Sequence, residues 1–410
     1  MRVPLISAAV TFVCYIVYSL SFLLPVEPMR IHVNESSDDL TEEAMYNVWI
    51  EGNPTAQNDG WSESLILSMV ICPSNPKDML VRPLVLQTIS VDGCESIFDS
   101  VQAYAANPGI EYTIGSNNRY WNGLVMILKV LLLFFSLSEV RLLCMLVQLI
   151  LTGLIFFKMA DNHFTYELIP FFLILFVLNP ATLGMSLKLI PEYIIMLGGT
   201  LFLLGRSDEF LNDAQKTALF FAATGTLTNF FGMLSFPLVT LSVPLLICVW
   251  RMYRTRSISI KSFVNWIISW FAGYFICWSC KWIACTLFTD ENLIANVLSR
   301  AAGYHSNESY TAMFLRNFHV YDNTLYRFLF IAAFLFFSGK ALFSKAGFPD
   351  RKSFAGLLTV YGILFVLPFL FFVLFGPGYA YNHHFMAYRN LSVSFAAPIC
   401  IVMHVAMKRN

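Results

Sequence analysis

Long apolar runs separated by short polar connections are the feature that most limits what this chain can fold into. One run covers about residues 4–24, and the later runs lie at about 121–137, 140–159, 164–180, 188–205, 217–233, 236–250, 262–288, 326–343, 354–375 and 391–407. A helix of about 20 apolar residues crosses the hydrocarbon core of a bilayer, and only helices and closed barrels satisfy the backbone in lipid. The pattern therefore predicts an all-α integral membrane fold.

The composition excludes several classes of soluble protein. Apolar residues make up 57% of the 410 positions and charged residues only 13%, whereas soluble domains carry about 25% charged residues. A soluble enzyme or a disordered scaffold would carry far more charge. The balance of 26 basic against 26 acidic residues gives no basis for binding nucleic acid. Membrane lipids are therefore predicted partners, and no nucleic-acid partner is expected.

One long polar region, residues 25–118, interrupts the apolar runs. It holds 14 acidic residues against three basic ones, Arg30, Lys77 and Arg82. Some of its apolar residues recur at helical spacing, which predicts short amphipathic helices lying on the membrane surface. We expect a large extracytoplasmic loop over 25–118 within a single polytopic membrane domain, 1–410.

Basic residues gather in three places, and these give the orientation. The groups are Arg251, Arg254, Arg256 and Lys261; Lys340, Lys345, Arg351 and Lys352; and Lys408 with Arg409. The positive-inside rule places them, and both chain termini, on the cytoplasmic side of the plasma membrane. Both ends of 121–180 must then lie outside, which requires an even number of crossings there. We therefore expect the short run 121–137 not to cross, and about ten spans in total.

The acidic loop supplies candidate carboxylates. Asp59 and Glu63 flank Trp61 just before an apolar helical stretch, and Glu35 lies nearer the first run. An acid at the start of a helix can simply cap it. A carboxylate beside the membrane surface is equally the usual general base for deprotonating a hydroxyl group. Both interpretations stay open at this point.

Polar side chains at the ends of the apolar runs are candidates for binding. Arg389 has a planar fork that matches phosphate oxygens, and His383 and His384 precede it closely. Two adjacent histidines without a third ligand do not indicate a metal, so neither a metal nor another cofactor is predicted. Arg389 alternatively anchors the chain at the interface beside its aromatic neighbours.

Lys281 and the segment 119–122 are also open to two interpretations, ligand binding or contact with the membrane interface. Lys281 lies inside an apolar run, where it either extends toward the interface or meets a lipid phosphate. The segment Arg119-Tyr120-Trp121-Asn122 either anchors the chain or binds a sugar ring and a phosphate. Lys188 and Glu192 are four residues apart and predict an ion pair along one helix face.

The layout resembles the GT-C superfamily of multispan membrane glycosyltransferases, in its bacterial cell-envelope branch that uses polyprenyl-phosphate sugars. The resembling segments are Asn58 to Leu67, Arg119 to Gly123, Thr228 to Leu241, Lys281 with Trp282, and His384 to Arg389. In order and spacing they cover most of the chain. The chain departs from the pattern at Asn122 (His in the family), at Gly232 (often near an acid) and at Glu63 (usually Asp).

This resemblance implies a one-step inverting transfer on the extracytoplasmic face. The donor would be a polyprenyl-phosphate sugar, and the acceptor a cell-envelope glycan or a lipid-linked saccharide. The base would be Asp59 or Glu63 with Glu35 in reserve, the phosphate would be held by Arg119, Lys281 and Arg389, and the sugar would stack on Trp61, Trp121 and Tyr388. The transferred sugar leaves a phosphate behind, so a divalent metal is optional.

Two other classes of function compete with an enzyme. A transporter or flippase of a lipid-linked saccharide would carry charged residues near the middle of several spans, together with broken helices. Here the polar residues gather at the outer ends of the runs instead, which favours a site at the interface. A non-catalytic subunit of a glycan-assembly complex is the third alternative, because the chain departs from the family pattern.

Overall fold

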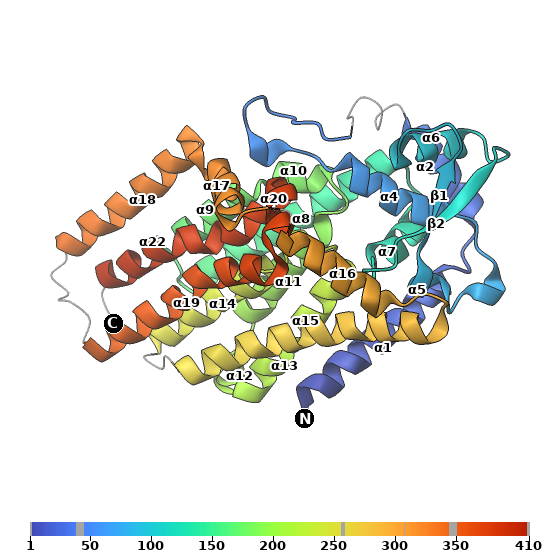
Figure 1. Cartoon of the computed structure of the whole chain (residues 1–410). Coiled ribbons are helices and arrows are strands. Elements are labelled where there is room, and N and C mark those ends of the chain that lie inside the picture. The colour runs from blue at the N-terminus through green and yellow to red at the C-terminus, as the bar shows by residue number, and fades with distance from the viewer. Residues whose placement is uncertain (1, 38–44, 256–258, 307, 344–350, 408–410) are drawn as a thin grey trace.

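Helices make up nearly all of the regular structure (Figure 1). The computed structural model describes residues 2–37, 45–255, 259–306, 308–343 and 351–407. Six described helices are long and apolar enough to cross a membrane, which supports a multi-pass membrane protein. They are α1 (Arg2–Ser21), α8 (Leu137–Asp161), α15 (Ile260–Phe288), α18 (Thr324–Leu342), α19 (Arg351–Phe375) and the continuous segment His384–Ala406. That last segment consists of α21 (His384–Ala387), η4 (Tyr388–Leu391) and α22 (Ser392–Ala406).

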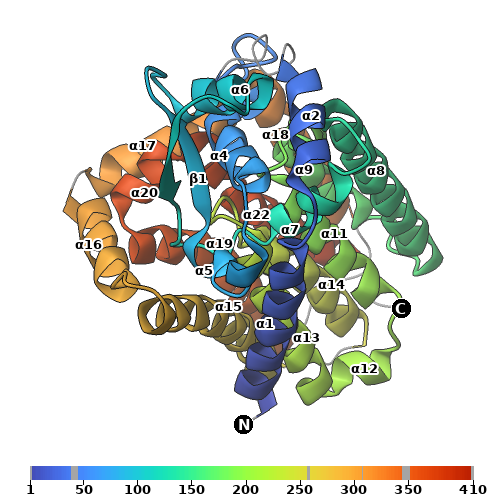
Figure 2. The ribbon, with the colours of Figure 1, turned by 90° about the vertical axis from the view of Figure 1, so that its right-hand side faces the viewer.

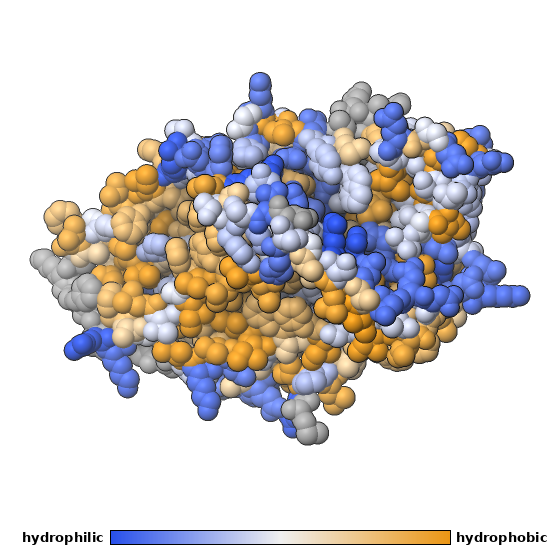
Figure 3. All heavy atoms as spheres, in the orientation of Figure 1, coloured by the Kyte–Doolittle hydropathy of each residue, from blue (hydrophilic) through white to orange (hydrophobic). Residues whose placement is uncertain are grey.

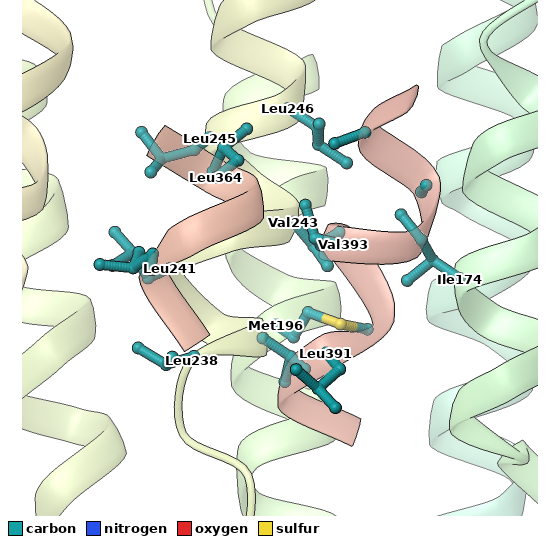
Figure 4. Close-up of a cluster of buried hydrophobic side chains, with 14 of the residues drawn as sticks. Ile174, Met196, Leu238, Leu241, Val243, Leu245, Leu246, Leu364, Leu391 and Val393 are labelled. Atoms are coloured by element: carbon teal, nitrogen blue, oxygen red, sulfur yellow. The ribbon is translucent and has the colours of Figure 1, made fainter. Parts of the chain in front are cut away.

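Shorter apolar helices fill the interior between these six. They are α9 (Leu168–Leu178), α11 (Ile190–Leu204), α13 (Ala214–Phe231) and α14 (Val239–Arg254). Buried aliphatic side chains of α9, α11, α14, α19 and α22 form a continuous core (Figure 4).

The packing of α13 on α15 depends on two glycines. A Cβ at Gly225 would lie 2.1 Å from the carbonyl oxygen of Trp270, and one at Gly273 would lie 2.0 Å from that of Ala222. Small residues allow such close helix packing.

The ends of several helices meet in a basic region. Arg251 of α14 donates to the carbonyl of Leu204 at the end of α11 and to the amide of Asn162 just after α8. Arg254 donates to the carbonyls of Asn162 and His163 and pairs with Glu167 at 3.0 Å. The hydroxyl of Tyr253 donates to the carbonyl of His404, near the end of α22. The C-terminal ends of α8, α11, α14 and α22 therefore lie together.

The region 25–118 folds as a compact layer at the other end of the molecule, opposite the N-terminus (Figure 2). Its elements are α2 (Val26–Glu35), η1 (Pro54–Ala56), α4 (Gly60–Ile71), η2 (Pro76–Asp78), α5 (Arg82–Val85), β1 (Gln87–Val91), α6 (Ile97–Ala106) and β2 (Tyr112–Ser116). The strands β1 and β2 pair antiparallel from Gln87↔Ser116 to Val91↔Tyr112, a sheet that the sequence analysis did not predict.

The helix α4 corrects the expectation of surface-lying amphipathic helices. All of its residues except Trp61 are buried, since α2, α6, α7 and β1 pack around it. A helix covered on every side has no use for a polar face, so its apolar residues recur all around the axis. α4 therefore lies in an apolar core that the layer shares with α1, α7 and α8, separate from the larger core of the bundle.

The run at 121–137 forms only α7 (Leu124–Leu131), eight residues long. Eight residues of helix span about 12 Å, too short to cross a bilayer. Lys129 of α7 does not extend toward the interface but is fully buried, where its ammonium donates to the carbonyl of Val70. α7 is not among the six described helices that are long and apolar enough to cross a membrane, which agrees with the expectation for this run.

Short helices complete the chain between these elements. They are α10 (Pro180–Met185), α12 (Asp208–Asn212), α16 (Leu293–Ser306), α17 (Tyr310–His319), η3 (Val320–Asp322) and α20 (Pro377–Asn382). In the space-filling view, hydrophobic side chains cover the face over α15 and α19, and hydrophilic ones gather toward α16 and the sheet (Figure 3). This distribution is the one expected of a bundle with an apolar belt and a polar end.

Candidate functional site

A cavity of about 480 Å³ lies where the outer layer meets the helix bundle. Its walls come from the segment before α4, the segment before α7, the start of α11, and the helices α16, α17, α20 and α21. The lining residues are Tyr46, Gln57, Asp59, Trp61, Ser62, Leu65, Asn117, Arg119, Tyr120, Lys188, Met233, Arg300, Tyr304, Arg316, Asn382, His383, His384 and Phe385. Six residues selected from the sequence thus share one cavity: Asp59, Trp61, Arg119, Tyr120, His383 and His384.

The carboxylate of Asp59 is held in place from two sides. Asp59 is the N-cap of α4, and its Oδ1 accepts a hydrogen bond of 3.1 Å from the backbone N–H of Ser62. Its Oδ2 lies 2.7 Å from Nζ of Lys188, which also donates to the Ser62 hydroxyl at 2.9 Å. Asp59 is therefore both a helix cap and the anion of a nearly buried ion pair.

The pairing of Lys188 differs from the sequence prediction. Lys188 lies just before α11, so it is not on the same helix face as Glu192. It pairs with Asp59, while Oε1 of Glu192 accepts a hydrogen bond of 3.3 Å from the backbone N–H of Ser235. The predicted Lys188–Glu192 ion pair is therefore wrong, because a tertiary partner 129 positions away in sequence replaced the local one.

The surroundings of Asp59 set its protonation state. Burial acts to raise the pKa of this carboxyl group, because a charged form is costly away from water. The positive charge of Lys188 and the hydrogen bonds from Lys188 and Ser62 act in the opposite direction and outweigh burial, so the pKa is lowered from its ordinary value. Asp59 is consequently a carboxylate at neutral pH.

Positive charge dominates the cavity. Lys188, Arg119, Arg300 and Arg316 face one acid, Asp59, among the described residues that line it. Arg300 stacks on Tyr304 with its guanidinium carbon 4.8 Å from the ring centroid, and Arg316 stacks on Tyr381 at 4.3 Å. A cleft with this charge attracts anions. Planar guanidinium groups suit phosphate in particular.

Aromatic residues behind Arg119 fix its position. The indole N–H groups of Trp278 and Trp282 donate to the carbonyl of Arg119, at 2.9 and 3.3 Å. The ring of Tyr120 stacks on Trp278 with centroids 5.7 Å apart. Trp61, by contrast, is 40% exposed and lines the opening of the cavity, where an indole face is available to a sugar ring.

The two histidines lie on the wall formed by α20 and α21. Burial, and then the charge of Lys188, lower the pKa of His383 to about 4, so its ring is neutral at physiological pH. The Nδ1 atom of His384 is buried and has no hydrogen-bond partner within the described structure. A ring nitrogen without a partner, such as Nδ1 of His384, can bind a hydroxyl group, or a phosphate oxygen when that nitrogen carries the proton.

Arg389 and Tyr388 lie elsewhere and have protein partners. The guanidinium of Arg389 is fully buried and donates to the carbonyls of Leu178, Phe385 and Thr55, at 3.0, 2.8 and 3.2 Å. The hydroxyl of Tyr388 donates to the carbonyl of Val177 at 3.1 Å. Neither residue lines the cavity. Both join the end of α9 to the start of α22.

Three other predicted binding residues are also placed outside the cavity. Lys281 is fully buried and donates to the carbonyls of Pro83 and Leu84, ahead of β1. The indole of Trp121 is buried and donates to the carbonyl of Cys277 at 2.8 Å. Asn122 is buried with a φ of +51°, a left-handed conformation that asparagine tolerates. Lys281 thus fastens the outer layer to α15, and Trp121 fastens the segment before α7 to the same helix.

The two alternative bases are also separated from the cavity. Glu63 is fully buried one turn into α4, where it pairs with Arg141 of α8 at 3.1 Å. Glu35 is the last residue of α2 and is exposed, away from the cavity lining. Asp38 and Asp39, the next two acids after Glu35 in the sequence, lie outside the described residues. Asp59 is thus the acid that the structure places among the cavity cations.

Several cavity residues were not selected from the sequence. Arg300, Tyr304 and Arg316 come from α16 and α17, in the long connection between the runs at 262–288 and 326–343. The signal available for them was a basic, aromatic connection on the predicted outer side. Nothing local in the sequence indicates that this connection folds back over Asp59.

We expect Arg389→Ala to destabilise the fold without weakening binding in the cavity. The substitution leaves three buried carbonyl groups without their donor and opens a void, which costs roughly 2–4 kcal/mol. Thermal unfolding in detergent measures this loss. Arg316→Ala is the matched control, since it should lower anion affinity and leave the unfolding temperature unchanged. Normal stability in Arg389→Ala would contradict the anchoring role.

The described part of the chain contains no group of three or more His, Cys, Asp or Glu side chains arranged to hold a metal ion. Comparison of the whole chain with protein-family models, curated proteins and solved structures finds no match.

Proposed function

We propose that this protein is a membrane glycosyltransferase that moves a sugar from a polyprenyl-phosphate donor to a cell-envelope glycan or lipid-linked saccharide. The observation that carries the proposal is the Asp59–Lys188 pair inside a cavity with three arginines. A deprotonated carboxylate, a phosphate-binding set of guanidinium groups and exposed aromatic faces are the groups that such a transfer uses. No cofactor is required by this chemistry.

The proposed step is a single inverting displacement. The acceptor hydroxyl attacks the anomeric carbon, a new carbon–oxygen bond forms, and the bond from that carbon to the phosphate oxygen breaks. The bonding electrons leave with the lipid phosphate, whose charge Arg119, Arg300 and Arg316 stabilise. The hydroxyl proton passes to Asp59. Lys188 keeps this carboxylate oriented and charged before the step.

The topology that we propose has ten crossings with both termini in the cytoplasm of the plasma membrane. The whole run at 164–180, whose helical part is α9, and the helices α11, α13 and α14 would cross in addition to the six long ones. The meeting of the ends of α8, α11, α14 and α22 beside Arg251 and Arg254 supports this arrangement, because positive residues mark the cytoplasmic side. The Asp59 cavity then faces the outside.

The pH dependence of transfer tests the role of the pair. With a lowered pKa at Asp59, the wild-type rate should fall only when the pH drops below the ordinary range of an aspartate. In Lys188→Met, burial of Asp59 remains while the compensating positive charge is lost, so the pKa of Asp59 rises. The acid limb, which is the fall of the transfer rate at low pH, then moves to higher pH. The readout is release of free polyprenyl phosphate from a radiolabelled donor by protein in nanodiscs.

His383→Gln is the control for this experiment. His383 has its pKa lowered to about 4, so its protonation would also contribute to an acid limb. Removing it should leave the shift between the wild type and Lys188→Met intact. An acid limb at the same pH with and without Lys188 would show that Asp59 is not the titrating base.

A further inference from the structure

Three hollows form a row along α17. The Asp59 cavity shares Gln57, Arg316 and His384 with a second hollow of about 780 Å³. The second shares Leu315 and His319 with a third hollow of about 640 Å³. The shared walls join a polar end at Asp59 to the third hollow, which we call the aromatic groove. Each volume falls in the range of about 300–1,000 Å³ typical of ligand sites.

The aromatic groove is apolar and lies among helices of the bundle. α18 and α19 both pack on α22, which lies between them (Figure 1). The groove lies over the first turn of α22, with walls from α17 and α19. Its rings are Phe318, Tyr321, Phe365, Phe369 and Phe395. Phe365 is 43% exposed, so the groove opens sideways on the apolar surface of the bundle.

The aromatic rings that line the groove are packed against one another, so the walls of the groove are held in place by residues of this chain. Tyr321 stacks on Phe395 with centroids 3.9 Å apart, and Phe318 lies 5.9 Å from Phe369 and 6.1 Å from Phe395. These contacts make firm walls for a preformed site. A bilayer-facing groove with such walls accepts a hydrocarbon chain.

The groove also carries Ser394 and the exposed Asp322–Arg327 ion pair, whose charges are matched within the pair, whereas cationic and imidazole groups that can take up an anion lie where the groove turns toward Asp59. Arg316 faces both the second hollow and the Asp59 cavity, and His319 lies where the second hollow meets the groove. The unpartnered Nδ1 atom of His384 lies on the wall between the second hollow and the Asp59 cavity, as far as the described residues show. An occupant with a long apolar tail and an anionic head fits this order of groups.

The geometry points to the aromatic groove as the site of the isoprenoid chain of a lipid phosphate, which runs along α17 and delivers its phosphate to Arg316 and the Asp59 cavity. This inference rests on the proposed function. It assigns the route by which a donor in the bilayer reaches Asp59, and it places Leu315, which lines both the groove and the second hollow, on that route.

Photo-labelling tests the route in the full chain. The protein in nanodiscs is irradiated with a polyprenyl phosphate that carries a diazirine at the end of its chain, and labelled peptides are identified by mass spectrometry. We expect labels on Phe365 and Phe369 that disappear with excess unlabelled polyprenyl phosphate. Labels on α8 at Leu149 and Ile150, which are exposed and apolar, should persist as background.

Two matched variants sharpen the result. Leu315 and Leu298 are both 65% exposed, and Leu298 lines none of the three hollows. Leu315→Trp should reduce the competed labelling by about tenfold, the size expected when a bulky group occludes a fitted site. Leu298→Trp should leave it unchanged. Equal labelling in the two variants would overturn the route.

The competitors separate the sources of the ligand. Suppression by polyprenyl phosphate but not by neutral polyprenol or phosphatidylglycerol supports the inference. Equal suppression by polyprenol would overturn recognition of the phosphate, and equal suppression by phosphatidylglycerol would identify an ordinary lipid site. Competed labelling without sugar transfer would keep the groove and reject the proposed function. Transfer without labelling in the groove would reject the groove alone.

Discussion

Asp59→Asn is expected to reduce acceptor-dependent release of polyprenyl phosphate by about 10²–10⁴-fold, the usual contribution of a general base. The amide cannot take the proton of the acceptor hydroxyl. Asparagine is as good an N-cap as aspartate, so the start of α4 should be preserved. The loss should therefore appear in the rate at saturating donor, with the protein still folded in nanodiscs.

The chain offers a control for the helix-capping part of this substitution, at an aspartate whose ion pair is exposed and not buried. Asp213 also caps a helix, α13, where it accepts from the backbone N–H groups of Gln215 and Lys216 and pairs with the Lys216 side chain at 3.3 Å. It does not line the cavity. Asp213→Asn should keep full activity. An Asp59→Asn protein as active as Asp213→Asn would remove Asp59 as the base.

Glu63→Ala should cause the largest loss of stability. Glu63 is fully buried against Arg141, and removing one partner of a buried ion pair leaves an uncompensated charge, which costs about 3–5 kcal/mol. The substitution also breaks the link from α4 to α8, which supports the helix that Asp59 caps. Thermal unfolding in detergent, followed by circular dichroism, measures the effect.

A double variant distinguishes charge from packing as the cause. Glu63→Leu together with Arg141→Met replaces both charges by apolar groups of similar size, which is often nearly neutral for stability. We expect the double variant to be more stable than Glu63→Leu and than Arg141→Met alone, which gives a coupling energy between the two sites. Single-variant losses that simply add up would contradict a direct interaction.

The sequence predicted what depends on local pattern. The runs at 140–159, 262–288, 326–343 and 354–375 are found as the long helices α8, α15, α18 and α19. The capping position of Asp59 was also readable, because an acid before an apolar helical stretch has few other local roles. Both conclusions follow from residues within a few turns of one another.

The partners of the buried cations were not readable from the sequence. Arg389 and Lys281 were candidates for binding phosphate, yet both donate to backbone carbonyls of segments far away in the chain. A carbonyl acceptor is present at every residue, so it leaves no mark in a sequence. Lys188 shows the same limit, since its local partner Glu192 was replaced by Asp59.

The outer layer was missed for a related reason. The interfacial interpretation of 25–118 assumed that short apolar stretches need the bilayer to cover them. α4 is instead covered by α2, α6, α7 and β1, and the apolar core around it is shared between the layer and the neighbouring helices of the bundle. Pairing of β1 with β2 joins segments separated by a helix, and such non-local pairing has no fixed sequence spacing.

Turnover of a defined donor by the wild-type protein tests the central claim most directly. Purified protein in sealed vesicles would receive radiolabelled polyprenyl-phosphate sugar on the face that carries Asp59, with and without a saccharide acceptor. Our account predicts acceptor-dependent release of free polyprenyl phosphate and a product of inverted anomeric configuration. Movement of the intact lipid-linked sugar across the bilayer, with no release under either condition, would contradict it and identify a transporter.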